Sequence, residues 1–326
     1  MVRLVDGPAY ARLLALSGVI TVLITRAYLA ATGYPKMGNG TLHIGRVLWG
    51  GLLMLAALLI ALVLSGHSAR RATALLGGAG LGLFVDEIGK YLTRTNDYFF
   101  RPAAGIIYVL FTGLLLLAWH LGRWRPASPD TRLANAAHIA ATGLASGLTA
   151  RQRQAALRLL DGRDDSEGRA VSRLIEAVPA RRPSIAWLLA RRPVEAVARL
   201  ADRPRLVAVV LAVYALGESV TAVVFVVQAL IVATGGHLAQ GTDEHTVVVQ
   251  AFTRTLSAIL AMTGIVRWRT DQPAATRWLR TAVLVDLLFT QVFNFTDSQF
   301  TAVLELPFEL LVLALTSYRT AHWTEQ

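Results

Sequence analysis

The sequence predicts an all-helical, polytopic integral membrane protein, and three observations lead to this prediction. Of its 326 residues, 54% are hydrophobic and only 16% are charged, whereas ordinary soluble proteins carry about 25% charged residues. The mean hydropathy is +0.49. The apolar residues gather into runs of about 20, the length that a helix needs to cross a bilayer. This composition excludes an ordinary cytosolic enzyme, and the absence of cysteine excludes disulfides, iron–sulfur clusters and thiolate chemistry.

Eight stretches are long and apolar enough to be predicted as spans. The first carries Arg26 and lacks an A-x-A site after it, so we expect a retained span rather than a cleaved signal peptide. The last two are joined at Asp297 and Ser298, and together they would be far too long for one span. The predicted spans are residues 13–32, 46–66, 72–92, 103–121, 206–234, 246–266, 279–296 and 301–318.

Basic residues in the short connections predict the orientation, because Lys and Arg accumulate on the cytoplasmic side. On one side lie Arg3, Arg12, Arg70, Arg71, Arg267, Arg269, Arg277, Arg280 and Arg319. The opposite connections hold Lys36, Arg94 and Arg101, balanced by Asp97, Asp243, Glu244 and Asp297. We therefore expect a multi-pass protein with both termini in the cytoplasm.

A basic cytoplasmic insert is predicted between two four-span halves, residues 1–122 and 206–326. Residues 123–205 hold 16 Arg and 8 acidic residues, a net +8 of the total +11. Their pattern predicts short amphipathic helices, with Thr149 as an N-cap and Gly162 at the end of one of them. Anionic lipid headgroups are the expected partners. Nucleic acid is not expected, since Trp187 is the one aromatic residue well inside the insert.

Order and spacing of matching residues predict that the two halves are an internal repeat of the same orientation. At an offset of 200, Val85-Asp86 matches Val285-Asp286, Asp97 matches Asp297 and Phe100 matches Phe300. Between the halves of such a repeat, a transport site is often found. The glycine-rich run from Gly77 to Gly82 has no strand before it and no Lys-Ser/Thr after it, so we expect close helix packing rather than phosphate binding.

Charges within the predicted spans are the main functional signal, because each is costly to place in a bilayer. Asp86 and Lys90 could pair along one helix face, which would leave Glu87 to a base such as Arg26 or Arg254 on a neighbouring helix. Glu305 and Glu309 could share a proton, a cation or an arginine, or could extend to the headgroups. The predicted substrate or ion site comprises Asp86, Glu87, Lys90, Asp286, Glu305, Glu309, Arg26 and Arg254, with Glu218 as a possible gate.

No catalytic motif and no cofactor pattern is present, and no metal is expected. An outer loop offers His237, Asp243, Glu244 and His245, but without a recognised metal-ligand spacing. The segment GLFVDEIGKYLTRTNDYFFRPAAGIIYVLF resembles that of uncharacterised multi-span membrane proteins of bacteria, which carry a similar acidic-G-K and N-D-Y-F-F-R-P run. This resemblance implies a bacterial inner-membrane setting and no activity.

Three functions fit the sequence. The leading one is a transporter or permease-like protein for a small ion or solute, in which protonation of Asp86 or Asp286 is coupled to alternating access. The second is a membrane-embedded enzyme that acts on a lipid or isoprenoid through a buried carboxyl group. The third is a scaffold or sensor in which intramembrane pairs fix the packing and the basic insert binds a partner. A homo-oligomer is compatible with each.

Overall fold

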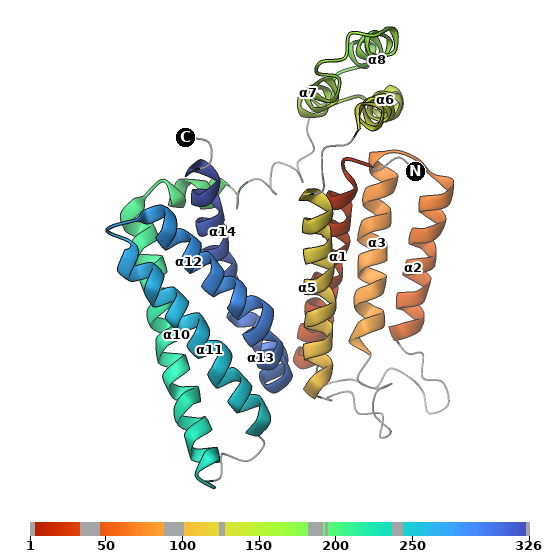
Figure 1. Ribbon diagram of the computed structural model, residues 1–326. Coiled ribbons are helices and arrows are strands. Elements are labelled where there is room, and N and C mark those ends of the chain that lie inside the picture. Colours follow the sequence, from red (N-terminus) through yellow and green to blue (C-terminus); the bar gives the residue numbers. More distant parts are fainter. Residues whose placement is uncertain are drawn as a thin grey trace, which may run out of the picture. The chain divides into compact units, whose positions relative to one another are not determined.

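The computed structural model describes residues 4–32, 46–87, 101–123, 128–181, 192, 195–236 and 244–323, and within them the protein is all-helical, as predicted (Figure 1). The helices in chain order are α1 (Gly7–Ala31), α2 (Arg46–Val63), α3 (His67–Asp86), α5 (Arg101–Arg123), α6 (Pro129–Ser146), α7 (Ala150–Leu159), α8 (Ser166–Ala177), α10 (Pro204–Ala233), α11 (Glu244–Arg267), α12 (Gln272–Val285), the π-helical η1 (Asp286–Thr290), α13 (Gln291–Ser298), the 3₁₀-helical η2 (Gln299–Leu304) and α14 (Leu306–Trp323).

Five of the described helices are long and apolar enough to cross a membrane, as expected for an integral membrane protein. They correspond to the first, fourth, fifth, sixth and eighth predicted spans. The second, α2, is apolar but shorter. The third, α3, is diluted by glycines and by a polar start, and the seventh is divided among α12, η1 and α13. The class of protein is therefore clear, while the count of eight spans stays a prediction.

Contacts divide the chain into two compact units. Unit 1 comprises Met1–Ile88 and Leu110–Leu188, and unit 2 comprises Gly89–Val109 and Leu189–Gln326. Helices α6, α7 and α8 of the predicted insert thus group with α1, α2 and α3. The beginning of α5 groups with the last helices of the chain.

Glycines bring the helices of unit 1 into close contact. A Cβ atom at Gly82 would lie 2.6 Å from the carbonyl oxygen of Gly18 in α1, and one at Gly78 would overlap the carbonyl oxygen of Leu14. On the other side of α3, a Cβ at Gly80 would lie 2.6 Å from the carbonyl oxygen of Gly50 in α2. The helix-packing role predicted for the glycine-rich run is confirmed, since α3 packs on α1 and α2 with backbone against backbone.

Helices α6, α7 and α8 form a small bundle around their own apolar core (Figure 1). Thr149 caps α7 as predicted, because its hydroxyl accepts from the Gln152 N–H at 3.3 Å while the Gln152 side chain accepts from the Thr149 N–H at 3.0 Å. The guanidinium of Arg153 donates to the carbonyl oxygens of Ile175 and Glu176 at the end of α8, at 2.6 and 3.0 Å. Sequence-local caps and one arginine thus fix the ends of these helices.

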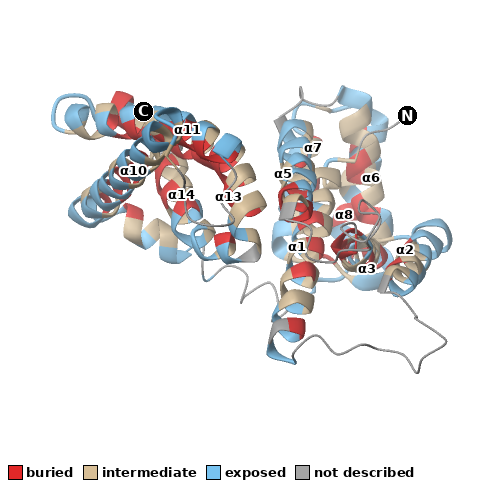
Figure 2. Ribbon diagram, turned by 90° about the horizontal axis from the view of Figure 1, so that it is seen from below, coloured by how far each residue is buried: buried red, intermediate tan, exposed pale blue. Residues whose placement is uncertain are grey.

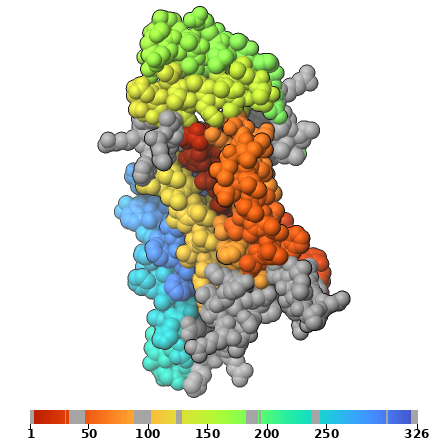
Figure 3. All heavy atoms as spheres, turned by 90° about the vertical axis from the view of Figure 1, so that its right-hand side faces the viewer, coloured from red at the N-terminus to blue at the C-terminus, as the bar shows by residue number. Residues whose placement is uncertain are grey.

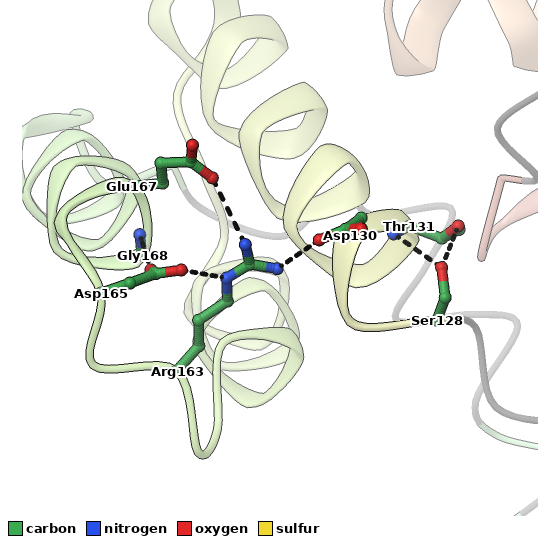
Figure 4. Close-up of polar contacts among 7 residues, drawn as sticks. All are labelled: Ser128, Asp130, Thr131, Arg163, Asp165, Glu167 and Gly168. Atoms are coloured by element: carbon green, nitrogen blue, oxygen red, sulfur yellow. Dashed lines mark hydrogen bonds and ion pairs between the residues drawn. The ribbon is translucent and has the colours of Figure 1, made fainter.

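Arg163, in the turn before α8, joins three carboxylates (Figure 4). Its guanidinium contacts Asp165 at 2.7 Å, Asp130 at the start of α6 at 3.0 Å, and Glu167 at 3.3 Å. The backbone N–H of Gly168 and the Arg163 guanidinium lower the pKa of the Asp165 carboxyl group. The beginnings of α6 and α8 are therefore held together by charge as well as by the apolar core.

Replacing Thr149 by alanine should destabilise α7 locally by about 1 kcal/mol, because the N-cap acceptor and the reciprocal Gln152 contact are both lost. Hydrogen exchange of the full-length protein should then show α7 amides exchanging about fivefold faster. Thr149→Ser keeps the hydroxyl group and serves as the matched control. Equal exchange in the alanine and serine variants would contradict the capping role.

Unit 2 is built around α11 and α12, which pack on each other and on α10 and α14 (Figure 2). Its apolar core includes Leu211 of α10, Leu279 and Val283 of α12, and Leu315 of α14. In the predicted repeat α3 would correspond to α12 and α2 to α11. The contact of α3 with α2 has a counterpart in that of α12 with α11, but the second main partner differs: it is α1 for α3 and α14, rather than α10, for α12. The internal repeat therefore stays a prediction.

Candidate functional site

In unit 2, a π-helical segment interrupts the seventh predicted span of the chain. After α12, residues Asp286–Thr290 form a wider turn in which the N–H of Gln291 bonds to the carbonyl oxygen of Asp286, five residues earlier. The Tyr108 hydroxyl donates to the carbonyl oxygen of Leu287 at 2.5 Å, and its ring stacks on Phe295 at 4.7 Å between centroids. Such π-helical turns are frequent at functional sites, and this one carries a buried carboxyl group.

Asp286 and Glu309 form a buried pair of carboxyl groups. Asp286 is 1% exposed and Glu309 is 5% exposed. The two carboxyl groups lie within hydrogen-bonding reach of each other. Carboxyl groups bond to one another only when one of them carries a proton, because two carboxylates have no donor between them. The pair thus has the geometry of a shared proton site.

Side-chain amides hold Glu305 and Glu309 from the neighbouring α13. Gln291 donates to both carboxyl groups, at 3.2 Å to Glu305 and over a short contact to Glu309. Asn294 donates to Glu305 at 2.8 Å. These two amides of the predicted seventh span therefore face carboxyl groups of the last span.

Arg254 and Glu218 complete this set from two further helices. A terminal nitrogen of Arg254 lies 3.9 Å from Glu305, and the guanidinium covers the ring of Phe225 at 4.9 Å. Glu218 interacts with the hydroxyl group of Ser257. We call this set the carboxylate cluster; it comprises Glu218, Arg254, Asp286, Gln291, Asn294, Glu305 and Glu309.

The carboxylate cluster has an excess of hydrogen-bond acceptors. Among the described residues, the buried carboxyl and amide oxygen atoms without a hydrogen-bond partner are Glu218 Oε2, Gln250 Oε1, Asp286 Oδ1 and Glu309 Oε2; the Thr290 hydroxyl group and Arg254 Nε nearby also lack one. These four residues come from α10, α11, η1 and α14. An unsatisfied buried acceptor costs about 1–3 kcal/mol, so four of them together point to a role other than packing.

The predicted site residues of unit 1 form a closed ion pair instead. Arg26 Nε donates to Asp86 Oδ1 at 2.6 Å, and a terminal nitrogen of Arg26 donates to the carbonyl oxygen of Asp86 at 3.1 Å. The sequence suggested Arg26 as one possible partner of Glu87, and the structure shows Arg26 in contact with Asp86. Glu87 is 3% exposed. Lys90, predicted to pair with Asp86, lies outside the described residues, as do His237 and Asp243 of the outer loop.

The predicted set thus belongs to two clusters, one in each unit. Arg26, Asp86 and Glu87 lie in unit 1, and Arg254, Asp286, Glu305, Glu309 and the possible gate Glu218 lie in unit 2. The sequence left open whether Glu305 and Glu309 extend to the headgroups or share a proton, a cation or an arginine. Glu309 is buried within the protein, and Glu305 lies close to Arg254.

Several residues of the site were not singled out from the sequence: Tyr108, Gln250, Ser257 and Gln291. A signal for some of them was present. Gln250, Arg254 and Ser257 follow one another at helical spacing in the sixth span and so share one face of α11. Tyr108 gave no signal, because its role depends on a carbonyl group whose position only the π-helical turn determines.

Within the described part of the chain, no group of three or more His, Asp or Glu residues could hold a metal ion. Comparisons of the chain with protein-family models, with curated proteins and with solved structures found no match. Fold and site therefore define the class, a helical membrane protein with a carboxylate cluster that is buried except for Glu305, from the residues alone.

A second polar cluster in unit 1 joins α6 to the beginnings of α1 and α3. The Asn135 side chain accepts from the Val5 N–H at 2.9 Å, and α6 lies next to the start of α1 (Figure 3). His67 Nδ1 lies 2.8 Å from the Tyr10 hydroxyl group. His67 and His138 line a small cavity here. The charged or titratable groups around them are Asp6, Tyr10, Arg70 and Arg71.

Acidification should loosen the contact of α6 with α1 and α3. Burial is the main cause that lowers the pKa of both His67 and His138 below the ordinary value of 6.5; Arg70 lowers both further, Arg71 also lowers that of His67, and Asp6 opposes them. As the pH falls through that value, the opened state takes up protons before the docked state does, so docking loses stability. Hydrogen exchange at Val5 and in α6 should rise between about pH 7.5 and about pH 5.5. A double His67→Asn, His138→Asn variant should lose this pH dependence; an unchanged dependence would exclude the histidines.

Proposed function

We propose that this chain is a proton-coupled membrane transport protein, and that the carboxylate cluster of unit 2 holds its coupling proton. The observation that supports this most is the Asp286–Glu309 pair, a buried carboxyl pair at a π-helical turn. Buried acids that can exchange a proton are the usual basis of proton coupling within membranes. Four helices contribute to the site, so a shift of any one of them changes the access of water to it.

We also propose the arrangement that the sequence predicts: eight spans in a bacterial inner membrane, with both termini in the cytoplasm. The basic helices α6, α7 and α8 would then contact anionic headgroups. Arg151, Arg158, Arg169 and Arg173 are exposed on these helices, and each could contribute about 1 kcal/mol near an anionic surface.

A purely structural role explains unit 2 less well. A scaffold would pair its buried charges, as Arg26 and Asp86 are paired in unit 1. The carboxylate cluster instead leaves acceptors on four helical elements unsatisfied. An enzymatic role would use the same carboxyl pair as an acid or base, but no other feature of the site favours it.

The test is infrared spectroscopy of the purified protein in lipid. The carbonyl stretch of a protonated, buried carboxyl group should be present at neutral pH and should disappear on raising the pH. Asp286→Asn and Glu309→Gln should each remove or shift this band. Glu244→Gln changes an exposed carboxylate at the beginning of α11 and is the matched control. A band that survives both variants would exclude the pair as the proton site.

Transport itself is tested in proteoliposomes that contain a pH-sensitive dye. Addition of a transported solute should move protons across the membrane in the wild-type protein and in Glu244→Gln. Asp286→Asn should abolish this proton movement, since it removes one of the two carboxyl groups that share the proton. Solute uptake that stays coupled to protons in Asp286→Asn would contradict the proposal.

A further inference from the structure

The unsatisfied acceptors of unit 2 indicate which chemistry a ligand would need. Asp286 and Gln250 are each 1% exposed, and each has an oxygen atom without a donor. Gln250 shares its helix face with Arg254 and Ser257, both of which contact the carboxylate cluster. The amide oxygen of Gln250 therefore lies on the helix face that is turned to the cluster, and it is an acceptor from a neutral residue.

The charge of the site favours a cation. Glu218, Asp286, Glu305 and Glu309 face one base, Arg254, so acidic groups outnumber basic groups in the cluster. The groups that lack partners are mostly oxygen acceptors rather than N–H donors. A suitable ligand brings positive charge and several hydrogen-bond donors together.

The ligand requirements of a metal ion favour an organic cation instead. A metal ion requires its ligands within about 2.0–2.6 Å, and no group of three acidic or histidine side chains that could hold a metal ion is found among the described residues. A cation with several N–H donors can bond to acceptors that come from different helices, each at about 2.9 Å. The resident guanidinium of Arg254, close to Glu305 and to the Phe225 ring, is an example of such a cation in this environment.

We propose that the carboxylate cluster binds a small organic cation with several N–H donors, a primary amine or a guanidinium compound, through Glu218, Gln250, Asp286 and Glu309. This inference rests on the proposed transport function and specifies its substrate class. The bound cation replaces the shared proton of Asp286 and Glu309, because both neutralise the same carboxyl groups. Entry of one cation should therefore release one proton, which is the stoichiometry of exchange.

Thermal unfolding of the purified full-length protein tests the ligand class. Methylguanidinium and methylammonium, added as chloride salts at constant ionic strength, should raise the unfolding temperature with saturation. Choline, an organic cation without N–H donors, and sodium should not. Protection by choline or sodium equal to that by methylguanidinium would overturn the assignment, and so would the absence of protection by all four.

Variants locate the site. Gln250→Leu and Glu218→Gln should each weaken methylguanidinium binding about tenfold or more, since the first removes a hydrogen-bond acceptor and the second removes an acidic group that faces the cation. Glu244→Gln should bind as the wild-type protein does. Wild-type affinity in both Gln250→Leu and Glu218→Gln would place the cation elsewhere.

A separate readout distinguishes this inference from the proposed function. If the infrared band of the shared proton is present but no amine or guanidinium binds, only the substrate class is wrong. If the band is absent while methylguanidinium binds, the proton-coupled function is wrong and a cation site remains. When both hold, methylguanidinium should diminish the band and release a proton into weakly buffered solution.

Discussion

Replacing Gly78 by alanine is expected to destabilise unit 1 by about 3 kcal/mol or more, the upper range of overpacking effects. The new Cβ atom would overlap the carbonyl oxygen of Leu14 and lie 2.8 Å from the Cβ of Ser17. Backbone cannot move aside as a flexible side chain does, so α1 and α3 must separate along their length. Separation would also disturb the second close approach, between Gly82 and Gly18, one turn along α3.

Unfolding of the purified protein, measured by heat or by denaturing detergent, should reveal this effect. Gly51→Ala in α2 and Gly113→Ala in α5 are matched controls, because a Cβ at either position meets nothing within 4 Å. Each control should be neutral or slightly stabilising, by up to about 1 kcal/mol, since alanine favours the helix over glycine. Equal stability of Gly78→Ala and Gly51→Ala would show that α1 and α3 are not packed backbone to backbone.

Removing the guanidinium of Arg26 should destabilise unit 1 by about 3–5 kcal/mol, the usual cost of leaving one partner of a buried ion pair alone. The Arg26→Ala variant leaves Asp86, which is 1% exposed, without its 2.6 Å contact. The carboxyl group then has to take up a proton or draw water into the span.

The double variant Arg26→Met, Asp86→Leu is the control for this pair. Replacing a buried ion pair with apolar residues of similar size is often neutral, so most of the lost stability should return. A double variant as unstable as Arg26→Ala would mean that the loss comes from packing around Arg26 rather than from the unpaired carboxylate.

Much of the fold could be predicted because its signals are local. Composition and the length of the apolar runs predicted the helical membrane class, and residue types at one position predicted the Thr149 cap and the close packing of the glycine-rich run. The candidate site could be predicted in part. Buried acids stand out in an apolar sequence, which is why Asp286 and Glu309 were expected to matter, whereas the role of the neutral Gln250 and Gln291 was missed.

The sequence alone determined the class of protein and the residues that carry unusual charge, because hydropathy and helical periodicity depend on neighbours along the chain. Tertiary structure decided the partners: Arg26 with Asp86, Asp286 with Glu309, and the amides of α13 with the carboxyl groups of the last span. Each pairing joins two different helical segments, and the π-helical turn at Asp286 changes the helix face on which Gln291 and Asn294 lie. No local sequence pattern contains this information, because a π-helical turn holds about one more residue than an α-helical turn without altering the composition of the span.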